Sequence, residues 1–266
     1  MPLEAMHPEA KSLELVTLPA LSDNYVFLLH DDASGETALI DVPEAAPVLE
    51  ALRLRGWTLS QIWLTHHHDD HIQGLPEVRE AFPDAVVFGA AADAHRLPPM
   101  DELLTGGERF DFAGHKVDVI DVPGHTLGHI AYHVPGAQVA FTGDSLMALG
   151  CGRLFEGTPA QMWDSLSKLA SLPPGTQICS GHEYTTTNAK FAASIEPDNP
   201  ALIYRISEIT HARSRNQPTV PSLLQTELDT NPFLRAALPG YGTHVGLPNS
   251  EAVDIFAKIR KLKDAF

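Results

Sequence analysis

The segment 65–71 constrains this chain more than any other part of its sequence, because it places six metal-ligand side chains in seven consecutive positions. It reads Thr-His-His-His-Asp-Asp-His and follows the apolar run 62–64, which predicts a buried strand. Active-site residues often lie where a strand passes into a loop. A terminal histidine run can be a purification tag, but this run is internal and interrupted by carboxylates. We therefore interpret it as a metal site.

Within this segment the spacing of the ligands predicts that their side chains point in two different directions. Alternate side chains of an extended segment share a face, so His66 and His68 can converge on one metal ion. The turn that follows directs Asp70 and His71 toward a second ion. One short segment can therefore supply ligands to two ions.

Three further ligand-type residues stand at expected strand ends, each directly after a glycine: His125, Asp144 and His182. Glycine lets the backbone turn sharply, so the side chain after it can project beyond the sheet edge. Each of the three, taken alone, would be interpreted as a turn residue. Together with the segment 65–71 they complete a set of seven ligands.

The seven ligands divide into two sites that share one carboxylate: His66, His68 and His125 in the first, Asp70, His71 and His182 in the second, and Asp144 in both. A carboxylate has two oxygens and can bridge ions that lie about 3.5–4 Å apart. Nitrogen and oxygen ligands without a thiolate suit Zn²⁺ and also accept iron or manganese. We expect two divalent ions per chain, with Zn²⁺ as the first candidate.

The charge and cysteine content narrow the possible partners and the compartment. The 266 residues include 18 Lys and Arg against 34 Asp and Glu, and 18 − 34 gives a formal charge of −16, which argues against an extended nucleic-acid surface. No apolar run is long enough to span a bilayer, and residues 1–12 read as a frayed tail without signal-peptide features. The two cysteines are too few for a disulfide scaffold, so a cytoplasmic protein is expected. We expect a monomer with a small-molecule substrate.

The hydrophobic pattern predicts alternating strands and helices and then helices alone. Strands are expected at 13–18, 25–30, 37–42, 62–64, 85–88, 109–112, 116–121, 130–133, 138–141 and 177–179, with none after residue 179. Helices are expected at 44–55, 159–170, 184–194, 200–215 and 250–266. Thr158, Pro159 and Gln161 form a helix-start signal with a capping box. This order predicts an α/β layered domain that carries a small helical appendage.

The ligand pattern His-x-His-x-Asp-His resembles that of the metallo-β-lactamase superfamily, and within it the chain resembles the glyoxalase II family, the hydroxyacylglutathione hydrolases, from about residue 13 to residue 266. The motifs that carry the narrower resemblance are Leu21–Tyr25, Thr65 before the histidines, Gly150–Arg153, His182–Thr185, Asn231–Arg235, and Arg260 and Lys263 before Asp264. The resemblance implies a four-layer αβ/βα sandwich at residues 13–183 and a C-terminal helical, substrate-binding domain at residues 184–266.

The resemblance also implies a reaction. A hydroxide bound between the two metals would hydrolyse S-2-hydroxyacylglutathione thioesters, so that S-D-lactoylglutathione gives D-lactate and glutathione in methylglyoxal detoxification. Asp144 is expected to bridge the ions and Asp70 to accept a proton during turnover. A thiolate is a good leaving group, so the reaction needs no dedicated general acid.

The resemblance assigns glutathione binding to five side chains: Arg153, Phe155, Tyr184, Arg260 and Lys263. Without it, the basic run 258–263 would be interpreted as the solvated face of an amphipathic helix. Phe155 stands where some relatives have Tyr, which would remove one hydroxyl contact.

Departures from the family pattern occur beside the metal ligands. Asp69 adds a carboxylate next to Asp70, and Gln73 and Leu75 replace the Gly and Asn usual after the last histidine. Alternation predicts that Asp69 points away from the metals. His67, His129 and Asp41 are expected to orient the ligands rather than bind metal.

Two other reactions use related sites. A persulfide dioxygenase of the same superfamily binds one iron through two His and an Asp, and has no use for the second set of ligands. An RNA-processing nuclease shares the dinuclear centre but needs a basic exosite, which a chain at −16 does not suggest. A non-catalytic metal-binding protein would require a blocked coordination position.

Overall fold

The first of two six-stranded sheets is formed entirely by the N-terminal part of the chain. The computed structural model describes residues 13–266, and the expected tail at residues 1–12 lies outside them. In spatial order the sheet contains β1 (Leu13–Ala20), β2 (Asn24–Asp31), β3 (Glu36–Ile40), β4 (Gln61–Trp63), β5 (Val86–Ala90) and β6 (Glu102–Leu104). β1 to β3 are antiparallel neighbours, whereas β3 to β6 run parallel. The carboxyl ends of the parallel strands therefore meet at one edge.

The second sheet faces the first and is mostly antiparallel. In spatial order it contains β14 (Ser222–Leu223), β13 (Gln177–Ser180), β10 (Val139–Gly143), β9 (Ile130–Val134), β8 (His115–Asp121) and β7 (Arg109–Phe112). A short separate hairpin, β11 (Leu146–Met147) and β12 (Gly150–Cys151), follows β10. β10 and β13 are parallel, so their carboxyl ends lie together beside the corresponding ends of the first sheet.

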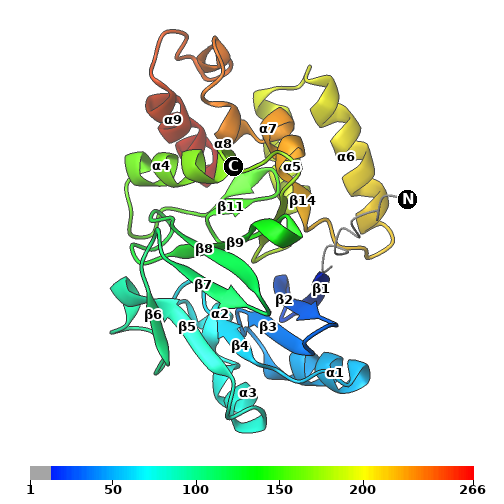
Figure 1. Ribbon diagram of the computed structural model, residues 1–266. Coiled ribbons are helices and arrows are strands. Elements are labelled where there is room, and N and C mark those ends of the chain that lie inside the picture. The colour runs from blue at the N-terminus through cyan, green and yellow to red at the C-terminus, as the bar shows by residue number, and fades with distance from the viewer. Residues whose placement is uncertain (1–12) are drawn as a thin grey trace, which may run out of the picture.

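Helices cover the outer faces of both sheets, as Figure 1 shows. The helices up to residue 170 are α1 (Ala45–Arg55), α2 (Asp69–Ile72), α3 (Leu75–Ala81) and α4 (Pro159–Ala170). The later helices are α5 (Thr185–Ile195), α6 (Pro200–Arg213), α7 (Leu224–Thr230), α8 (Pro232–Arg235) and α9 (Ala252–Asp264). α1 and α3 pack on the first sheet through one apolar cluster, and α4, α8 and α9 pack on the second through another. The layers run helix, sheet, sheet, helix, as expected from the sequence.

Aromatic side chains fill the space between the sheets and fix the position of the metal-ligand segment. The buried Trp63 ring lies 5.6 Å from Phe112 and 5.4 Å from Tyr132, which belong to the second sheet. The Tyr132 hydroxyl donates a hydrogen bond to the carbonyl of Leu64 at 2.8 Å. The residue just before Thr65 is therefore attached to the opposite sheet.

The prediction that no strand follows residue 179 was wrong, because β14 pairs with β13 in antiparallel register. β14 has only two residues, which are too few to show an alternating pattern. Its one apolar residue, Leu223, is 49% exposed. The helices at 44–55, 159–170, 184–194, 200–215 and 250–266 are confirmed to within a few residues.

The predicted capping box at the start of α4 is confirmed, and it supplies a test of the fold. The Thr158 hydroxyl accepts a hydrogen bond from the Gln161 backbone N–H at 3.2 Å, and the Gln161 side chain accepts one from the Thr158 N–H at 2.9 Å. Thr158→Ala should lower the free energy of unfolding by about 1 kcal/mol in urea denaturation. Ser167→Ala, at an exposed position of α4, should change it by less than about 0.5 kcal/mol. Equal values for the two variants would contradict the cap's role.

Candidate metal centre and substrate cavity

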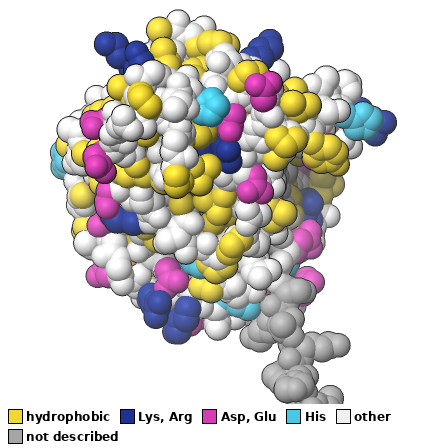
Figure 2. Space-filling view, turned by 90° about the horizontal axis from the view of Figure 1, so that it is seen from above, with side chains coloured by type: hydrophobic (Ala, Val, Ile, Leu, Met, Phe, Trp, Pro, Cys, Tyr) yellow, Lys and Arg dark blue, Asp and Glu magenta, His cyan; other side chains and the backbone are white. Residues whose placement is uncertain are grey.

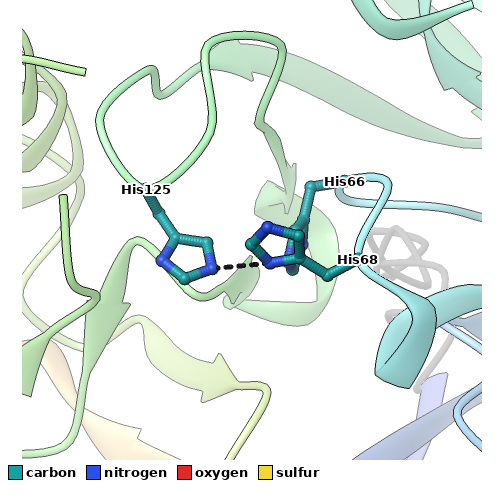
Figure 3. Close-up of side chains that lie close together, drawn as sticks. All are labelled: His66, His68 and His125. Carbon is teal, nitrogen blue, oxygen red and sulfur yellow. Dashed lines mark hydrogen bonds between the residues drawn. The ribbon is translucent and has the colours of Figure 1, made fainter. Parts of the chain in front are cut away.

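Three imidazoles converge at the junction of the two sheets, as Figure 3 shows. His68 Nδ1 lies 3.1 Å from His66 Nε2 and 3.0 Å from His125 Nε2. His66 and His68 come from the segment after β4, and His125 comes from the loop between β8 and β9. The nitrogens are close enough together to share one ion, as the alternation of the segment predicts.

The remaining ligand-type side chains lie around the carboxylate of Asp144, just after β10. Asp144 Oδ2 lies 3.3 Å from His125 Nε2 and 3.3 Å from His182 Nε2, and Oδ1 lies 3.5 Å from His71 Nε2. His182 Nε2 is also 3.4 Å from Asp70 Oδ2. Asp70, His71 and His182 form a second group of possible ligands beside the first. The structure thus brings all seven sequence-predicted side chains together, with Asp144 between the groups.

Local backbone geometry explains why glycines precede these residues. Gly143 has a φ of +46°, a left-handed conformation that turns the chain from β10 into Asp144. A Cβ on Gly181 would lie 2.7 Å from Asp144 Oδ1 and 2.7 Å from His71 Cε1. The loop after β13 can approach the centre this closely only because residue 181 has no side chain.

In four of the five ligand imidazoles, the ring nitrogen that faces away from the centre has a partner, which orients the ring. The contacts are His66 Nδ1 with Thr65 Oγ1 at 3.0 Å, His71 Nδ1 with Asp41 Oδ2 at 2.8 Å, His125 Nδ1 with the Arg153 carbonyl at 2.9 Å, and His182 Nδ1 with Asp23 Oδ1 at 2.9 Å. Such outer contacts are typical of histidines that bind metal, because they fix the tautomer.

Asp41 and His129 lie where the sequence suggested, behind the ligands. Asp41 has a φ of +56° at the end of β3, and its carboxylate accepts hydrogen bonds from both the N–H and the hydroxyl of Thr65, each at 2.8 Å. His129 Nε2 accepts a hydrogen bond from the Asp144 N–H at 3.0 Å. Asp69 is exposed, in agreement with the prediction that it points away from the centre.

Burial and neighbouring charges shift the pKa values of the groups at the centre. Burial lowers the pKa of His66 well below its ordinary value, so its ring is neutral and its nitrogen can bind metal. Burial opposes protonation of His71, but Asp144 and Asp41 raise its pKa well above the ordinary range. Burial likewise opposes ionisation of Asp144, but His71 and His182 hold its pKa well below the ordinary range. Without a metal ion, a proton on His71 balances the negative charges of Asp144 and Asp41. A bound cation would balance the same charges.

The donor atoms fit a divalent metal ion. Among the described residues, His71 Nε2 and Asp144 Oδ1 are buried without a hydrogen-bond partner. Buried polar atoms without partners are costly, and binding of a metal is one way in which they are satisfied. The residues that would hold such ions are the seven named above, and the site is a divalent-metal centre.

A cavity of about 640 Å³ opens onto this centre. His68, Asp70, His125, Asp144 and His182 line its inner end, and the five predicted substrate residues, Arg153, Phe155, Tyr184, Arg260 and Lys263, line its walls. The Tyr184 ring stacks on His182 with centroids 4.7 Å apart, and the Phe155 ring lies 5.2 Å from that of His125. The two aromatic side chains therefore flank the metal centre.

The two basic residues of α9, Arg260 and Lys263, differ in how many partners within the protein their charged groups already have. Arg260 is 5% exposed and donates hydrogen bonds to the Cys151 carbonyl at 2.9 Å and to Asp264 at 3.1 Å. Lys263 donates to the Thr187 carbonyl at 3.5 Å, and among the described residues no carboxylate lies within 4.0 Å of its ammonium group. Burial, followed by Arg260 and Arg153, lowers the pKa of Lys263 to about 8.

Cys151 lines the cavity but is unsuited to act as a nucleophile. Burial raises the pKa of its thiol to about 11, so the reactive thiolate is rare at neutral pH. Cys151 ends the short strand β12 and is flanked by Gly150 and Gly152.

Sequence reasoning gave no role to two residues that contact the ligands from β2 and the turn before it. Asp23 contacts His182, and the Asn24 side chain donates hydrogen bonds to Asp70 Oδ2 at 3.1 Å and to the Asp70 carbonyl at 2.9 Å. Both lie in the motif 21–25, which marked the narrower resemblance, so their position in that motif was the available signal.

Two family models together match most of the described chain. The model of the metallo-beta-lactamase superfamily matches residues 24–182, and the model of the hydroxyacylglutathione hydrolase C-terminus matches residues 183–266. A hydroxyacylglutathione hydrolase of Roseobacter denitrificans is 61% identical over 254 residues, which cover 96% of this chain and 99% of the relative.

Solved structures share the fold at lower identity. The B3 metallo-beta-lactamase BLEG-1 is 22% identical with a TM-score of 0.65, covering 83% of this chain and 99% of that protein. The protein TTHA1623, solved in a di-iron-bound form, is 28% identical with a TM-score of 0.55, covering 64% of this chain and 91% of that protein.

Metal binding should stabilise the folded chain strongly, because the ligands converge only after folding. With free Zn²⁺ about a thousandfold above its dissociation constant, the gain is about 4 kcal/mol, or roughly 10 °C in Tm. We expect this rise on adding Zn²⁺ to chelator-treated protein, measured by differential scanning calorimetry. Asp144→Asn should lose most of the rise, whereas His95→Ala, at an exposed position, should keep it. An unchanged rise in Asp144→Asn would count against the site.

Proposed function

We infer that this chain, which belongs to the hydroxyacylglutathione hydrolases of the metallo-beta-lactamase superfamily, hydrolyses S-2-hydroxyacylglutathione thioesters. S-D-lactoylglutathione would give D-lactate and glutathione, a step in methylglyoxal detoxification. The observation that carries the proposal is a single cavity that is lined both by the metal centre and by basic side chains. We further propose that residues 13–183 form the metal-binding domain and residues 184–266 the substrate-binding domain, in a cytoplasmic monomer.

We propose two divalent ions per chain, with Zn²⁺ as the first candidate. His66, His68 and His125 would hold one ion, Asp70, His71 and His182 the other, and Asp144 both. The two groups of donors and the di-iron form of TTHA1623 support a dinuclear site. Donors without a thiolate suit Zn²⁺ but leave iron and manganese as alternatives. When bound, such ions lower the pKa of a coordinated water and polarise a carbonyl oxygen.

The basic side chains of the cavity wall bind the tripeptide. Glutathione carries carboxylates at both ends, and Arg153, Arg260 and Lys263 line the cavity into which they would enter. Among the described residues, the Lys263 ammonium has no carboxylate partner and lies 5.3 Å from the rings of Phe191 and Phe266, whereas Arg260 is already paired with Asp264 at 2.8 Å. We assign the main attraction for the glycyl carboxylate to Lys263, and to Arg260 a shared role in binding and in holding Cys151.

Asp70 has the environment that a proton acceptor requires. Its side chain is 43% exposed, lines the cavity and is held by Asn24. A carboxylate that is fixed yet open to solvent can take a proton and release it again. The thiolate leaves without protonation, so the remaining wall residues need only hold the thioester and exclude water.

The alternatives are less well supported. A persulfide dioxygenase with a single iron would leave Asp70, His71 and His182 without a purpose, although they lie together in the structure. A nuclease would need a basic exosite, and on the face shown in Figure 2 the Lys and Arg side chains are scattered rather than gathered.

Among the described residues, no helix is both long and apolar enough to cross a membrane.

Activity measurements with S-D-lactoylglutathione test the assignment. Asp144→Ala should remove metal and turnover together, because it deletes the shared ligand. Lys263→Ala should raise KM about tenfold with little change in kcat, as expected when a uniform binding contact is lost. Lys261→Ala, an exposed lysine of the same helix, should leave both constants unchanged. Arg260→Ala should raise KM and also lower stability, because its internal hydrogen bonds are lost. Unchanged KM in both Lys263→Ala and Arg260→Ala would contradict the substrate.

Substrate affinity should depend on pH through Lys263. The pKa of Lys263 is about 8, so the ammonium is present below that pH and is lost above it. The KM of the wild type should therefore rise as the pH increases from 7 to 9. The arginine side chain in Lys263→Arg stays charged at both pH values. The ratio of KM at pH 9 to KM at pH 7 should therefore be clearly smaller in this variant than in the wild type. Equal ratios in the two proteins would exclude Lys263 as the titrating group.

A further inference from the structure

A second polar cluster lies behind the wall of the cavity, beside the His66–His68–His125 group. It consists of His67, Asp93, Arg96 and Glu156, and none of the four lines the cavity. Asp93 is 1% exposed and belongs to the short helical turn after β5, while Glu156 belongs to the loop after β12. The mechanism proposed above does not use this cluster.

Arg96 is the centre of the cluster. Its guanidinium donates hydrogen bonds to both carboxylate oxygens of Glu156, one of them at 3.2 Å, and also to Asp93. The hydrogen bond from Arg96 holds the pKa of Glu156 at about 2, so the pair stays charged at every pH at which the protein works. Bidentate contacts of this kind fix geometry as well as charge.

Through Glu156 and Asp93, the cluster is attached to both segments that carry ligands of the first site. Glu156 Oε2 accepts a hydrogen bond at 2.7 Å from the N–H of Leu127, two residues after His125. Asp93 Oδ2 lies 3.0 Å from Nδ1 of His67, the residue between His66 and His68.

Asp93 also packs so closely against the loop after His125 that position 128 has no room for a side chain. A Cβ on Gly128 would lie 2.2 Å from Asp93 Cγ. Asp93 is therefore buried against this loop, whereas the side chains of Arg96 and Glu156 are 29% and 24% exposed.

Glu156 also follows the two wall residues of the same loop. Phe155 precedes it directly, and Arg153 lies three positions earlier. Both side chains are exposed and line the cavity, and the Phe155 ring contacts those of His68 and His125. The backbone hydrogen bond from the Gly157 N–H to the Gly124 carbonyl, at 3.0 Å, adds a second attachment of this loop to the His125 loop.

We propose that Arg96 and Glu156 are positioning residues for substrate binding: they fix the loop 152–157, with Arg153 and Phe155, at a set distance from the metal ligands. The proposal rests on the glutathione-thioester function inferred above. Displacement of a binding group by about 1 Å can cost up to two orders of magnitude in rate or affinity. Because Arg153 and Phe155 are assigned to binding of the tripeptide rather than to the reaction, the loss should fall on KM and leave kcat nearly unchanged.

The test compares Glu156→Gln, Arg96→Ala and Arg96→Lys with Arg79→Ala. Glu156→Gln keeps the volume and the acceptor for Leu127 but removes the charge that orients Arg96. Arg79→Ala removes an ion pair of Arg79 with Asp101 at 3.3 Å, away from the cavity, and is the matched control. For each protein we would measure KM and kcat for S-D-lactoylglutathione, the dissociation constant of glutathione by calorimetry, the metal content and Tm.

We expect Glu156→Gln and Arg96→Ala to raise KM and the glutathione dissociation constant about five- to twentyfold, with kcat within about threefold and unchanged metal content. Arg96→Lys should restore part of the affinity, and Arg79→Ala should match the wild type. A fall in Tm without a change in glutathione affinity, or a loss of metal that accounts for the lost activity, would overturn the proposal. Failure of the wild type to hydrolyse the thioester would instead refute the proposed function, while glutathione binding would still test the cluster.

Discussion

The centre of this protein depends on one buried carboxylate. Asp144 is 5% exposed and lies within 3.5 Å of imidazole nitrogens from helix α2 and from two loops. A buried charge is tolerated only when it is paired, so the fold must bring His71, His125 and His182 to this point. The parallel ends of the two sheets meet there, and the glycine before each of Asp144 and His182 makes the close approach possible.

The cavity wall depends on a different part of the chain. α9 brings Arg260 and Lys263 over the centre because its apolar face packs on α4 and α8, next to the second sheet. The hairpin of β11 and β12 is held in turn by Asn231, whose side chain donates hydrogen bonds to the carbonyls of Met147 and Gly150. The basic residues of α9 thus come from a different part of the chain than the metal ligands, whereas Arg153 and Phe155 lie on a loop that is hydrogen-bonded to the His125 loop.

Much of this arrangement could be predicted from the sequence, and the failures share a cause. The ligands could be predicted because each stands in a local pattern, an apolar run followed by glycine or by the alternating segment 65–71. β14, with two residues, and α2, with four, are too short to show a period. The contact of Asp23 with His182 and the cluster around Arg96 join residues that are far apart in sequence, and no local pattern indicates such pairs.

The most direct test of the account is a crystal structure of the metal-loaded protein with anomalous diffraction recorded at the metal absorption edge. The account predicts two anomalous peaks about 3.5–4 Å apart, one beside His66, His68 and His125 and the other beside Asp70, His71 and His182, with Asp144 touching both. A single peak, or two peaks that Asp144 does not bridge, would contradict it.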